Sequence, residues 1–393
     1  MTDIINVLEK PLMDERIIKK DYHTYTPYIQ SFNNNDEIRI SIQNQDLYVL
    51  PSESFLYIEG SVLESKSGKS SKNIKLKNNF VPNLFEEIRY ELNGVEIDRT
   101  RHLGISGTIK NVLSLNDSES IMMGNASWSY DKDIDVGEGF FNFYVSLKSL
   151  LGFAEDYNKI IMNCKHELIL LRTKNDDNIV HSTEAGENRK ISIQNISWRI
   201  PHVKLSDYSK LNTIKIIKSG NVLPVAFRSW DCHYHPQLST SQNHIWNVKF
   251  SANRERPRFV LIAFQHENKL THCNLNNLKV HLNSESYPYD DLNVKFDNQR
   301  YAILYDMYVK FQPNFYMREP QPLLSAEQFK EKAPIIVIDV SHQNETVTTG
   351  PIDIKVEFAM DKIAKTNTSA YCLLIHDRLI EYSPLTASVK KIV

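Results

Sequence analysis

The stretch EIRYELNGVEIDRTRHLGI, residues 87–105, has the pattern of a tight hairpin that runs directly into a helix. Apolar residues alternate with polar ones on both sides of a turn, as in a half-buried strand, at Ile88, Tyr90, Leu92, Val95 and Ile97. Asn93-Gly94 tolerates positive φ at both turn positions and predicts a type I′ turn. Apolar residues at helical spacing follow, at Leu103, Ile109, Val112 and Leu113.

A second unit of the same kind occurs in the other half of the chain, in LKVHLNSESYPYDDLN, residues 278–293. Asn283-Ser284 takes the place of Asn93-Gly94, and a helical pattern follows again, at Tyr301, Leu304, Tyr305 and Tyr308. The pairs Leu92-Asn93 and Leu282-Asn283 lie 190 residues apart in a chain of 393, which is close to half its length.

The strands around these units also align in order between the two halves. RISIQ (39–43) and FLYIEG (55–60) correspond to WNVKF (246–250) and FVLIAF (259–264). CKHELILLR (164–172) corresponds to IDIKVEFAM (352–360). The pattern therefore predicts two similar β-domains in tandem, each of about 170 to 190 residues.

Most of the remaining chain also predicts strands, since short runs rich in Ile, Tyr, Phe and Val suit a pleated surface. Such runs are 37–43, 54–63, 140–147, 166–172, 191–200, 222–230, 244–252, 258–265, 333–341, 352–360 and 370–377. We expect an all-β protein of two tandem jelly rolls, each an eight-stranded β-sandwich, with a few short helices in loops. An immunoglobulin-type domain is usually nearer 100 residues.

Helices and loops complete the expected organisation. Ser206 could cap a helix within 204–220 that Gly220 ends, and Ser325 with Gln328 forms a capping-box pattern for 325–332. Polar stretches that read as solvent loops are 65–75, 131–139 and 174–188. The predicted partition is an N-terminal arm (1–21), a first jelly roll (22–205), a linker helix (206–220), a second jelly roll (221–389) and a C-terminal tail (390–393). The arm reads either as a frayed terminus or as an amphipathic segment that docks on a partner.

The composition is that of an ordinary globular protein, with 41% hydrophobic and 24% charged residues and a formal net charge of −2. This charge argues against a protein that binds nucleic acid through a basic surface. Four cysteines without a CxxC pair favour a reducing compartment. Neither a secretory signal nor an apolar run of transmembrane length is expected from the sequence.

The search for chemistry finds no catalytic motif, and we expect no enzyme, cofactor or metal site. His233 and His235 would face the same side of a strand, which allows a cupin-like metal pair, but Pro-Gln-Leu-Ser-Thr follows where cupins need a Glu. The alternative is a polar strand end. Tyr287-Pro288-Tyr289-Asp290-Asp291 could be a calcium or sugar site, or a turn that positions the next helix. The cluster at 254–258 is either a phosphate contact or a solvated turn.

The chain resembles the double jelly-roll major capsid proteins of Polinton/Maverick- and adintovirus-like elements of arthropods and other animals. The resemblance lies in FEEIRYELNGVEIDRTRHLGI (85–105), LLGFAEDYNKIIMNCKHELILLR (150–172), 227–265, 282–312, APIIVIDVSHQNETVTTGPIDIKVEF (333–358) and TSAYCLLIHDRLIEYSPLT (368–386). These segments span nearly the whole chain.

The resemblance implies a structural, non-enzymatic protein of the virion that forms a homotrimer and then an icosahedral capsid lattice. It implies penton and minor capsid proteins as partners, a DNA genome enclosed without strong sequence-specific contact, and membrane or minor-protein contact by the N-terminal arm. Each hairpin–helix unit is expected to stiffen its domain and supply trimer contacts. The candidate residues are Tyr90, Asn93, Gly94, Ile97, Arg99, Asn283, Tyr287, Tyr289, Asp290, Tyr305 and Tyr308.

Two other functions stay open at the level of sequence. A sugar-binding protein with tandem β-sandwiches would respond to calcium or glycans. A cupin-like metalloprotein centred on His233 and His235 would retain bound metal.

Overall fold

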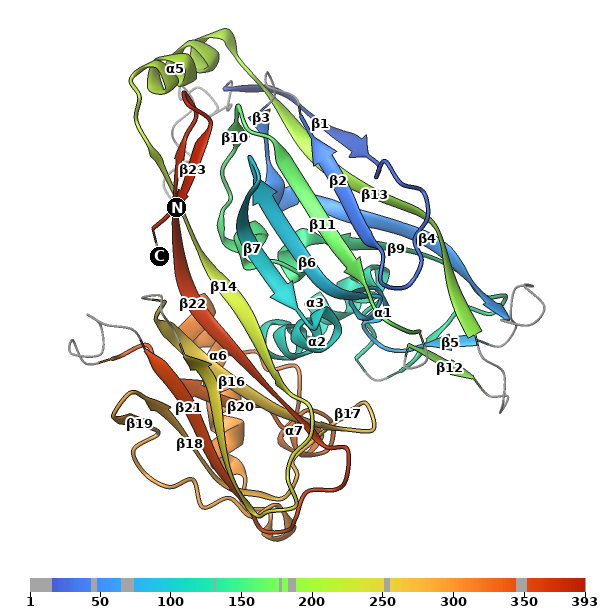
Figure 1. Cartoon of the computed structure of the whole chain (residues 1–393), viewed down its shortest axis with the longest axis vertical. Coiled ribbons are helices and arrows are strands. Elements are labelled where there is room, and N and C mark those ends of the chain that lie inside the picture. The colour runs from blue at the N-terminus through green and yellow to red at the C-terminus, as the bar shows by residue number, and fades with distance from the viewer. Residues whose placement is uncertain are drawn as a thin grey trace, which may run out of the picture.

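A computed structural model shows two β-sandwiches joined along their length, with helices filling the space between them (Figure 1). The structure describes residues 16–43, 48–64, 74–130, 132–176, 179–182, 189–250, 255–343 and 352–392. No helix in these ranges is both long and apolar enough to cross a membrane.

The first sandwich consists of two antiparallel sheets. Sheet 1A has the order β1–β13–β4–β9, with the short β3 and β10 alongside, and sheet 1B has the order β2–β11–β6–β7. Their bounds are β1 Ile17–Tyr25, β2 Glu37–Ile42, β3 Tyr48–Val49, β4 Phe55–Glu64, β6 Phe85–Leu92, β7 Val95–Arg101, β9 Phe140–Ser146, β10 Ile161–Met162, β11 His166–Arg172 and β13 Arg189–Leu205.

The second sandwich repeats this order. Sheet 2A runs β14–β22–β16–β20, with β17 and β23 at its margins, and sheet 2B runs β15–β21–β18–β19. Their bounds are β14 Leu223–His235, β15 Asn243–Phe250, β16 Pro257–His266, β17 Lys269–Thr271, β18 Leu275–Leu282, β19 Glu285–Tyr287, β20 Ile336–Asp339, β21 Asp353–Met360, β22 Ser369–Ser383 and β23 Ser388–Lys391.

The two sheets of each sandwich place eight strands in the same order, so each sandwich is a jelly roll and the predicted fold class is confirmed. The correspondence predicted from sequence is confirmed strand by strand. The strands β2, β4, β6 and β11 of the first sandwich occupy the places of β15, β16, β18 and β21 in the second.

Both hairpin–helix units form where the sequence predicts them. Asn93 and Gly94 have φ of 49° and 78°, as a type I′ turn requires, and Asn283 has φ of 54°. The first unit leads into α2 (Leu103–Ser114) and the second into α6 (Ala302–Tyr316).

The linker helix and the short helix near the end of the chain are also confirmed. Ser206 accepts a hydrogen bond from the backbone N–H of Ser209 and caps α5 (Asp207–Lys218). Ser325 and Gln328 form a capping box at the start of α7 (Ala326–Lys332). The other helices are α1 Phe80–Asn83, α3 Asp117–Met122 and α4 Gly152–Asp156.

Three predictions about irregular segments need correction. In the segments predicted as solvent loops, the described residues form strands of a small sheet. Its strands are β12 (Val180–Ser182), β5 (Ile74–Leu76) and β8 (Ile134–Asp135). They form because each strand carries at least one apolar side chain that the neighbouring residues can bury. Residues 17–21, assigned to the arm, begin β1, which pairs with β13. Residues 390 and 391, assigned to the tail, lie in β23. Residues 1–15 of the predicted arm lie outside the described residues.

The hydrophobic cores do not follow the predicted domain boundary. Ile109, Val112 and Leu113 of α2 belong to the core of the second jelly roll. Conversely, the start of β14 and the end of β22 lie in the core of the first, through Val225, Phe227, Ile380 and Tyr382. Because β14 and β22 run from one core into the other (Figure 1), the two jelly rolls are held as one unit.

Candidate functional site

Three of the predicted contact residues lie in the interior of the subunit. Tyr90 and Ile97 are fully buried, and the Tyr90 hydroxyl lies 2.7 Å from Nδ1 of His166. Tyr308 is also buried, donates to the carbonyl of Val112 at 3.2 Å and accepts from the N–H of Leu324. These side chains therefore hold the subunit together, and they offer no surface to a second chain.

The two turn asparagines tie each hairpin to its neighbouring strand. The side chain of Asn93 accepts from the N–H of Lys165 at 2.8 Å and donates to the carbonyl of Ala387 at 2.6 Å. Asn283 accepts from the N–H of Asp353 at 2.9 Å. The Asn at each turn thus serves both the backbone conformation and the attachment of the hairpin.

The other candidates are more accessible. Arg99 is half-buried and lies 3.5 Å from Glu96, and Tyr305 is half-buried and donates to the carbonyl of Leu324 at 2.9 Å. Gly94 has open space around its Cα. Tyr287 ends β19, and Tyr289, which follows it, is 88% exposed beside the exposed Asp290. Gly94, Asn283, Tyr289 and Asp290 are thus the exposed candidates, and Tyr289 is the large hydrophobic side chain among them.

The alternative chemical sites gain no support from the geometry. His233 pairs with Asp231 at 3.2 Å, while His235 packs edge-on against Trp246 with ring centroids 5.6 Å apart. The described residues contain no group of three or more His, Cys, Asp or Glu that could hold a metal ion. Asp291 pairs with Lys279 at 2.8 Å, which fits the turn interpretation of residues 287–291.

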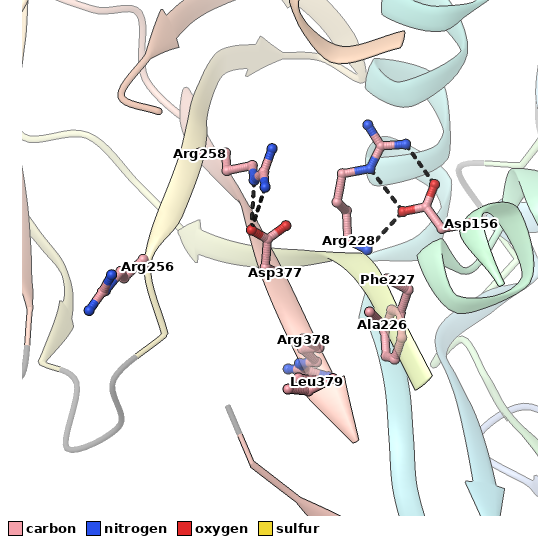
Figure 2. Close-up of a pocket in the computed structure, with 9 residues that line it drawn as sticks. All are labelled: Asp156, Ala226, Phe227, Arg228, Arg256, Arg258, Asp377, Arg378 and Leu379. Atoms are coloured by element: carbon pink, nitrogen blue, oxygen red, sulfur yellow. Dashed lines mark hydrogen bonds and ion pairs between the residues drawn. The ribbon is translucent and has the colours of Figure 1, made fainter. Parts of the chain in front are cut away.

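The junction between the jelly rolls concentrates the polar interactions that sequence reasoning missed. Arg228 of β14 makes a bidentate pair with Asp156 at the end of α4, at 2.8 and 2.6 Å (Figure 2). The same guanidinium donates to the carbonyl of Phe315 at 2.6 Å and lies 3.8 Å from the centroid of its ring. One side chain therefore fixes α4, β14 and the end of α6 together.

A buried carboxylate makes the second connection across the junction. Asp98 of β7 is fully buried and accepts from the backbone N–H of Phe153 at 2.9 Å and from the hydroxyl of Ser229 at 2.6 Å. Arg378 of β22 lies 3.8 Å from it. A buried carboxylate is stable only when it is paired and hydrogen-bonded, so these partners must assemble together.

A third connection joins the two helices that follow the hairpins. The carboxylate of Glu155 receives Lys110 of α2 at 2.7 Å and the hydroxyl of Tyr316 of α6 at 2.9 Å. Burial, with the adjacent Glu155, holds the pKa of Tyr316 well above its usual range, so this hydroxyl stays a donor. The junction is thus specified by charge and hydrogen bonding as well as by apolar packing.

A cavity of about 640 Å³ opens at the edge of this junction. Its walls, shown in Figure 2, are Asp156, Ala226, Phe227, Arg228, Arg256, Arg258, Asp377, Arg378 and Leu379. The basic cluster predicted at 254–258 contributes Arg256 and Arg258, while residue 254 lies outside the described residues. Arg258 pairs with Asp377 at 2.7 Å, and Asp98 and Glu255 lie near Arg378. Carboxylates thus accompany the arginines, and the cavity has no clear excess of positive charge.

Sequence reasoning could not locate the junction, because its members are far apart in the chain and each is ordinary alone. Asp156 and Arg228 are 72 positions apart, and Asp98 and Ser229 are 131 apart. The one available signal was Asp98, a charged residue in a strand pattern that otherwise alternates, next to a buried Ile97.

The chain was compared with protein-family models, with curated proteins and with solved structures. A family model described as a double jelly roll-like domain matches residues 74–380. No curated protein matches the chain.

Solved structures of viral proteins share the architecture. VP54 of PBCV-1, as fitted into a reconstruction of the virophage Sputnik, has a TM-score of 0.62 and 10% identity over 98% of this chain and 99% of that one. The major capsid protein of Faustovirus has a TM-score of 0.61 and 10% identity over 99% and 92%. The mavirus major capsid protein has a TM-score of 0.56 and 11% identity over 95% and 90%. At such identities the similarity establishes the fold.

Proposed function

The chain belongs to the double jelly roll-like family, and we propose that it is the major capsid protein of a virus or virus-derived element. In this proposal three copies form a trimer, and trimers tile an icosahedral shell. The capsid proteins of Faustovirus and mavirus share the fold over nine-tenths or more of both chains. In this proposal the role of the chain is structural and not enzymatic.

One observation carries the proposal: the two jelly rolls have the same strand order and are joined by strands that enter both cores. β14 and β22 pass from one core to the other, and the Arg228–Asp156 pair and the buried Asp98 secure the crossing. A shell requires subunits that keep their shape under load and carry repeated surfaces in a fixed relation. A protein whose two similar halves are joined by shared strands meets both requirements.

The partners follow from the same proposal. Separate penton and minor capsid proteins would complete the shell, and the DNA genome would be enclosed without sequence-specific contact, in keeping with a net charge of −2. The N-terminal arm would contact a membrane or a minor protein. Among the hairpin–helix candidates, Gly94, Asn283, Tyr289 and Asp290 are the ones whose exposure suits contact between subunits.

Light scattering of the purified chain, followed by negative-stain imaging of the same sample, tests the proposal. We expect a stable species of three times the 45.6 kDa chain mass, with a hexagonal outline, or spontaneous shells. A chain that stays monomeric across salt and pH would contradict it.

A further inference from the structure

The outer face of sheet 2A, which points away from its own sandwich, is covered within the subunit. The six residues of β16 from Phe259 to Phe264 are buried on both faces of the sheet. Phe259 and Trp230 pack on the α6 rings of Phe311 and Phe315, with centroids 5.2 to 6.2 Å apart. The side chains on this outer face are therefore buried against α6, as the side chains on the inner face are buried within the sandwich.

The first jelly roll supplies part of that cover with the segment that follows its hairpin. His102, directly after β7, lies with its ring centroid 5.0 Å from Tyr234 and 5.9 Å from Tyr371 on sheet 2A. Lys110, further along α2, lies 5.4 Å from the ring of Trp230. Within one subunit, the residues that follow the hairpin of the first jelly roll thus pack on the outer face of sheet 2A in the second.

Among the residues that the structure describes, none covers the equivalent face of sheet 1A in this way. β9 alternates exposed and buried residues, whereas the three apolar residues of its counterpart β20, Ile336 to Ile338, are all buried. We call this outer side the aromatic face, and its members are Tyr22, Phe55, Tyr57, Phe140, Tyr144 and Arg199. Phe55 is buried and Tyr57 is half-buried, whereas the other four side chains are exposed.

Two groups of side chains on the aromatic face are in contact, and a groove adjoins the face at Phe140. The ring centroid of Phe55 lies 5.4 Å from that of Tyr22 and 3.9 Å from that of Tyr144, and Arg199 lies 5.4 Å from the ring centroid of Tyr57. A groove of about 520 Å³ adjoins it, with Phe140 in its wall. Aromatic and arginine side chains on an uncovered surface are the composition of an interface centre.

We propose that the aromatic face of one subunit binds the segment after β19, residues 288–291, of a second copy of this chain. β19 occupies in sheet 2B the place that β7 has in sheet 1B, so residues 288–291 correspond to the segment that begins at His102. Repeating the contact made inside the subunit between two copies gives a heterologous interface, and such an interface closes into a ring when its rotation allows. This inference rests on the proposed function and names the surfaces of its trimer.

The chemistry of the two surfaces is complementary. Tyr289 is 88% exposed and would add an aromatic ring to the aromatic face. Asp290 is exposed next to it, and Arg199 is exposed on the aromatic face. An Arg–Asp pair placed beside stacked aromatic rings would fix the orientation of one subunit on the next.

Charge reversal tests the pairing. We expect Arg199→Glu and Asp290→Arg each to raise the trimer dissociation constant by about tenfold or more, measured by light scattering over a dilution series. The double variant should recover most of this loss, because the charges are then opposite again. Lys269→Glu, an exposed charge reversal on β17, is the matched control and should leave the constant unchanged.

A covalent trap gives a readout that does not depend on affinity. Arg199→Cys combined with Asp290→Cys should form intermolecular disulfides under mild oxidation, seen as dimers and trimers on a non-reducing gel. Each single cysteine variant should give far less of these species. The native Cys164, Cys232 and Cys372 are buried, so the single variants also report any background from Cys273.

The outcomes separate this inference from the function on which it rests. A wild-type monomer would overturn the proposed capsid function. A wild-type trimer that both charge reversals leave intact, with no cross-link between positions 199 and 290, would retain the capsid function and overturn the proposed interface. Loss of the trimer without rescue in the double variant would also reject the Arg199–Asp290 pairing.

Discussion

The helices α2 and α6 follow equivalent hairpins, yet they pack against different parts of the subunit. α6 packs on the outer face of its own sheet 2A through Phe311 and Phe315. α2 has Leu103 in the first core, but Ile109 and Val112 lie in the second. Both helices thus fill one space between the jelly rolls, and the outer face of sheet 1A keeps its aromatic side chains accessible. The helix after a repeated hairpin can therefore cover its own sheet in one half of the chain and pack into the other half's core in the second case.

Truncating one aromatic residue on each outer face tests most directly whether the face of sheet 2A is covered and the face of sheet 1A is accessible. Trp230→Ala removes a buried ring that contacts Phe311 and Phe315, and we expect a loss of about 3 to 5 kcal/mol in the free energy of unfolding. Tyr144→Ala on the accessible face should cost less than about 1 kcal/mol. Urea unfolding of dilute subunits measures both, and equal losses would contradict the proposed difference between the faces.

Removing the buried carboxylate of the junction tests whether the jelly rolls depend on each other. Asp98→Ala leaves the N–H of Phe153 and the hydroxyl of Ser229 without their acceptor. We expect a loss of about 2 to 4 kcal/mol in the free energy of unfolding. Ser229→Ala, which removes one donor and keeps the carboxylate, should cost about 1 kcal/mol. If Asp98→Ala were neutral, the junction would not be held by this group.

The first jelly roll should lose stability in acid because of a buried histidine. Burial, with His202 nearby, lowers the pKa of His166 from 6.5 to about 3. The unfolded chain therefore takes up a proton first, so the contribution of neutral His166 is fully present above pH 6.5 and falls as the pH drops toward 3. The loss is about 1.4 kcal/mol per pH unit, or about 2 kcal/mol at pH 5.

His166→Gln keeps a hydrogen-bonding side chain that cannot be charged, so it should flatten this dependence. Urea unfolding between pH 7 and 4.5 measures the slope for both proteins. An unchanged slope in the variant would assign the acid sensitivity elsewhere, with His202, whose pKa burial lowers to about 4, as the next residue to test.

Two capping boxes give the smallest effect and the finest comparison. Asn116 caps α3 beside the junction, and Ser325 caps α7 in the second jelly roll. Each change to Ala should cost about 1 kcal/mol in unfolding free energy, since one helix-end N–H loses its acceptor. Glu119 of α3 pairs with Arg318 at 3.0 Å, so a larger loss for Asn116→Ala would show that α3 also supports the junction. Equal losses would mean that the two caps act only on their helices.

Local patterns predicted most of the elements for physical reasons. Alternation at β6 and β7 reports one covered face, and Asn93-Gly94 supplies the backbone that a tight turn requires. β1 escaped prediction because nearly every residue of IIKKDYHTY is exposed, which leaves no alternating pattern to read. The small sheet of β5, β8 and β12 escaped because its strands are two or three residues long.

The candidate contact residues differ in burial, and their role as contacts stays a prediction. Tyr289 and Asp290 were identified and lie at the surface, whereas Tyr90, Ile97 and Tyr308 lie inside the subunit. An apolar or aromatic residue in a strand or helix pattern faces either its own core or a partner, and both choices give the same periodicity. The members of the aromatic face were not among the candidates for the same reason.

Periodicity, together with residues that have special backbone or capping properties, was enough to predict two jelly rolls, the correspondence of strands between them, the hairpin turns and the capped helices. Only the tertiary structure decided which strands cross between the cores, that Arg228 meets Asp156 and Ser229 meets Asp98, and which outer face stays uncovered. Those features depend on side chains that are distant in the chain and meet only after folding. The free energy of such a contact depends on both side chains together, so the sequence of one segment alone does not predict it.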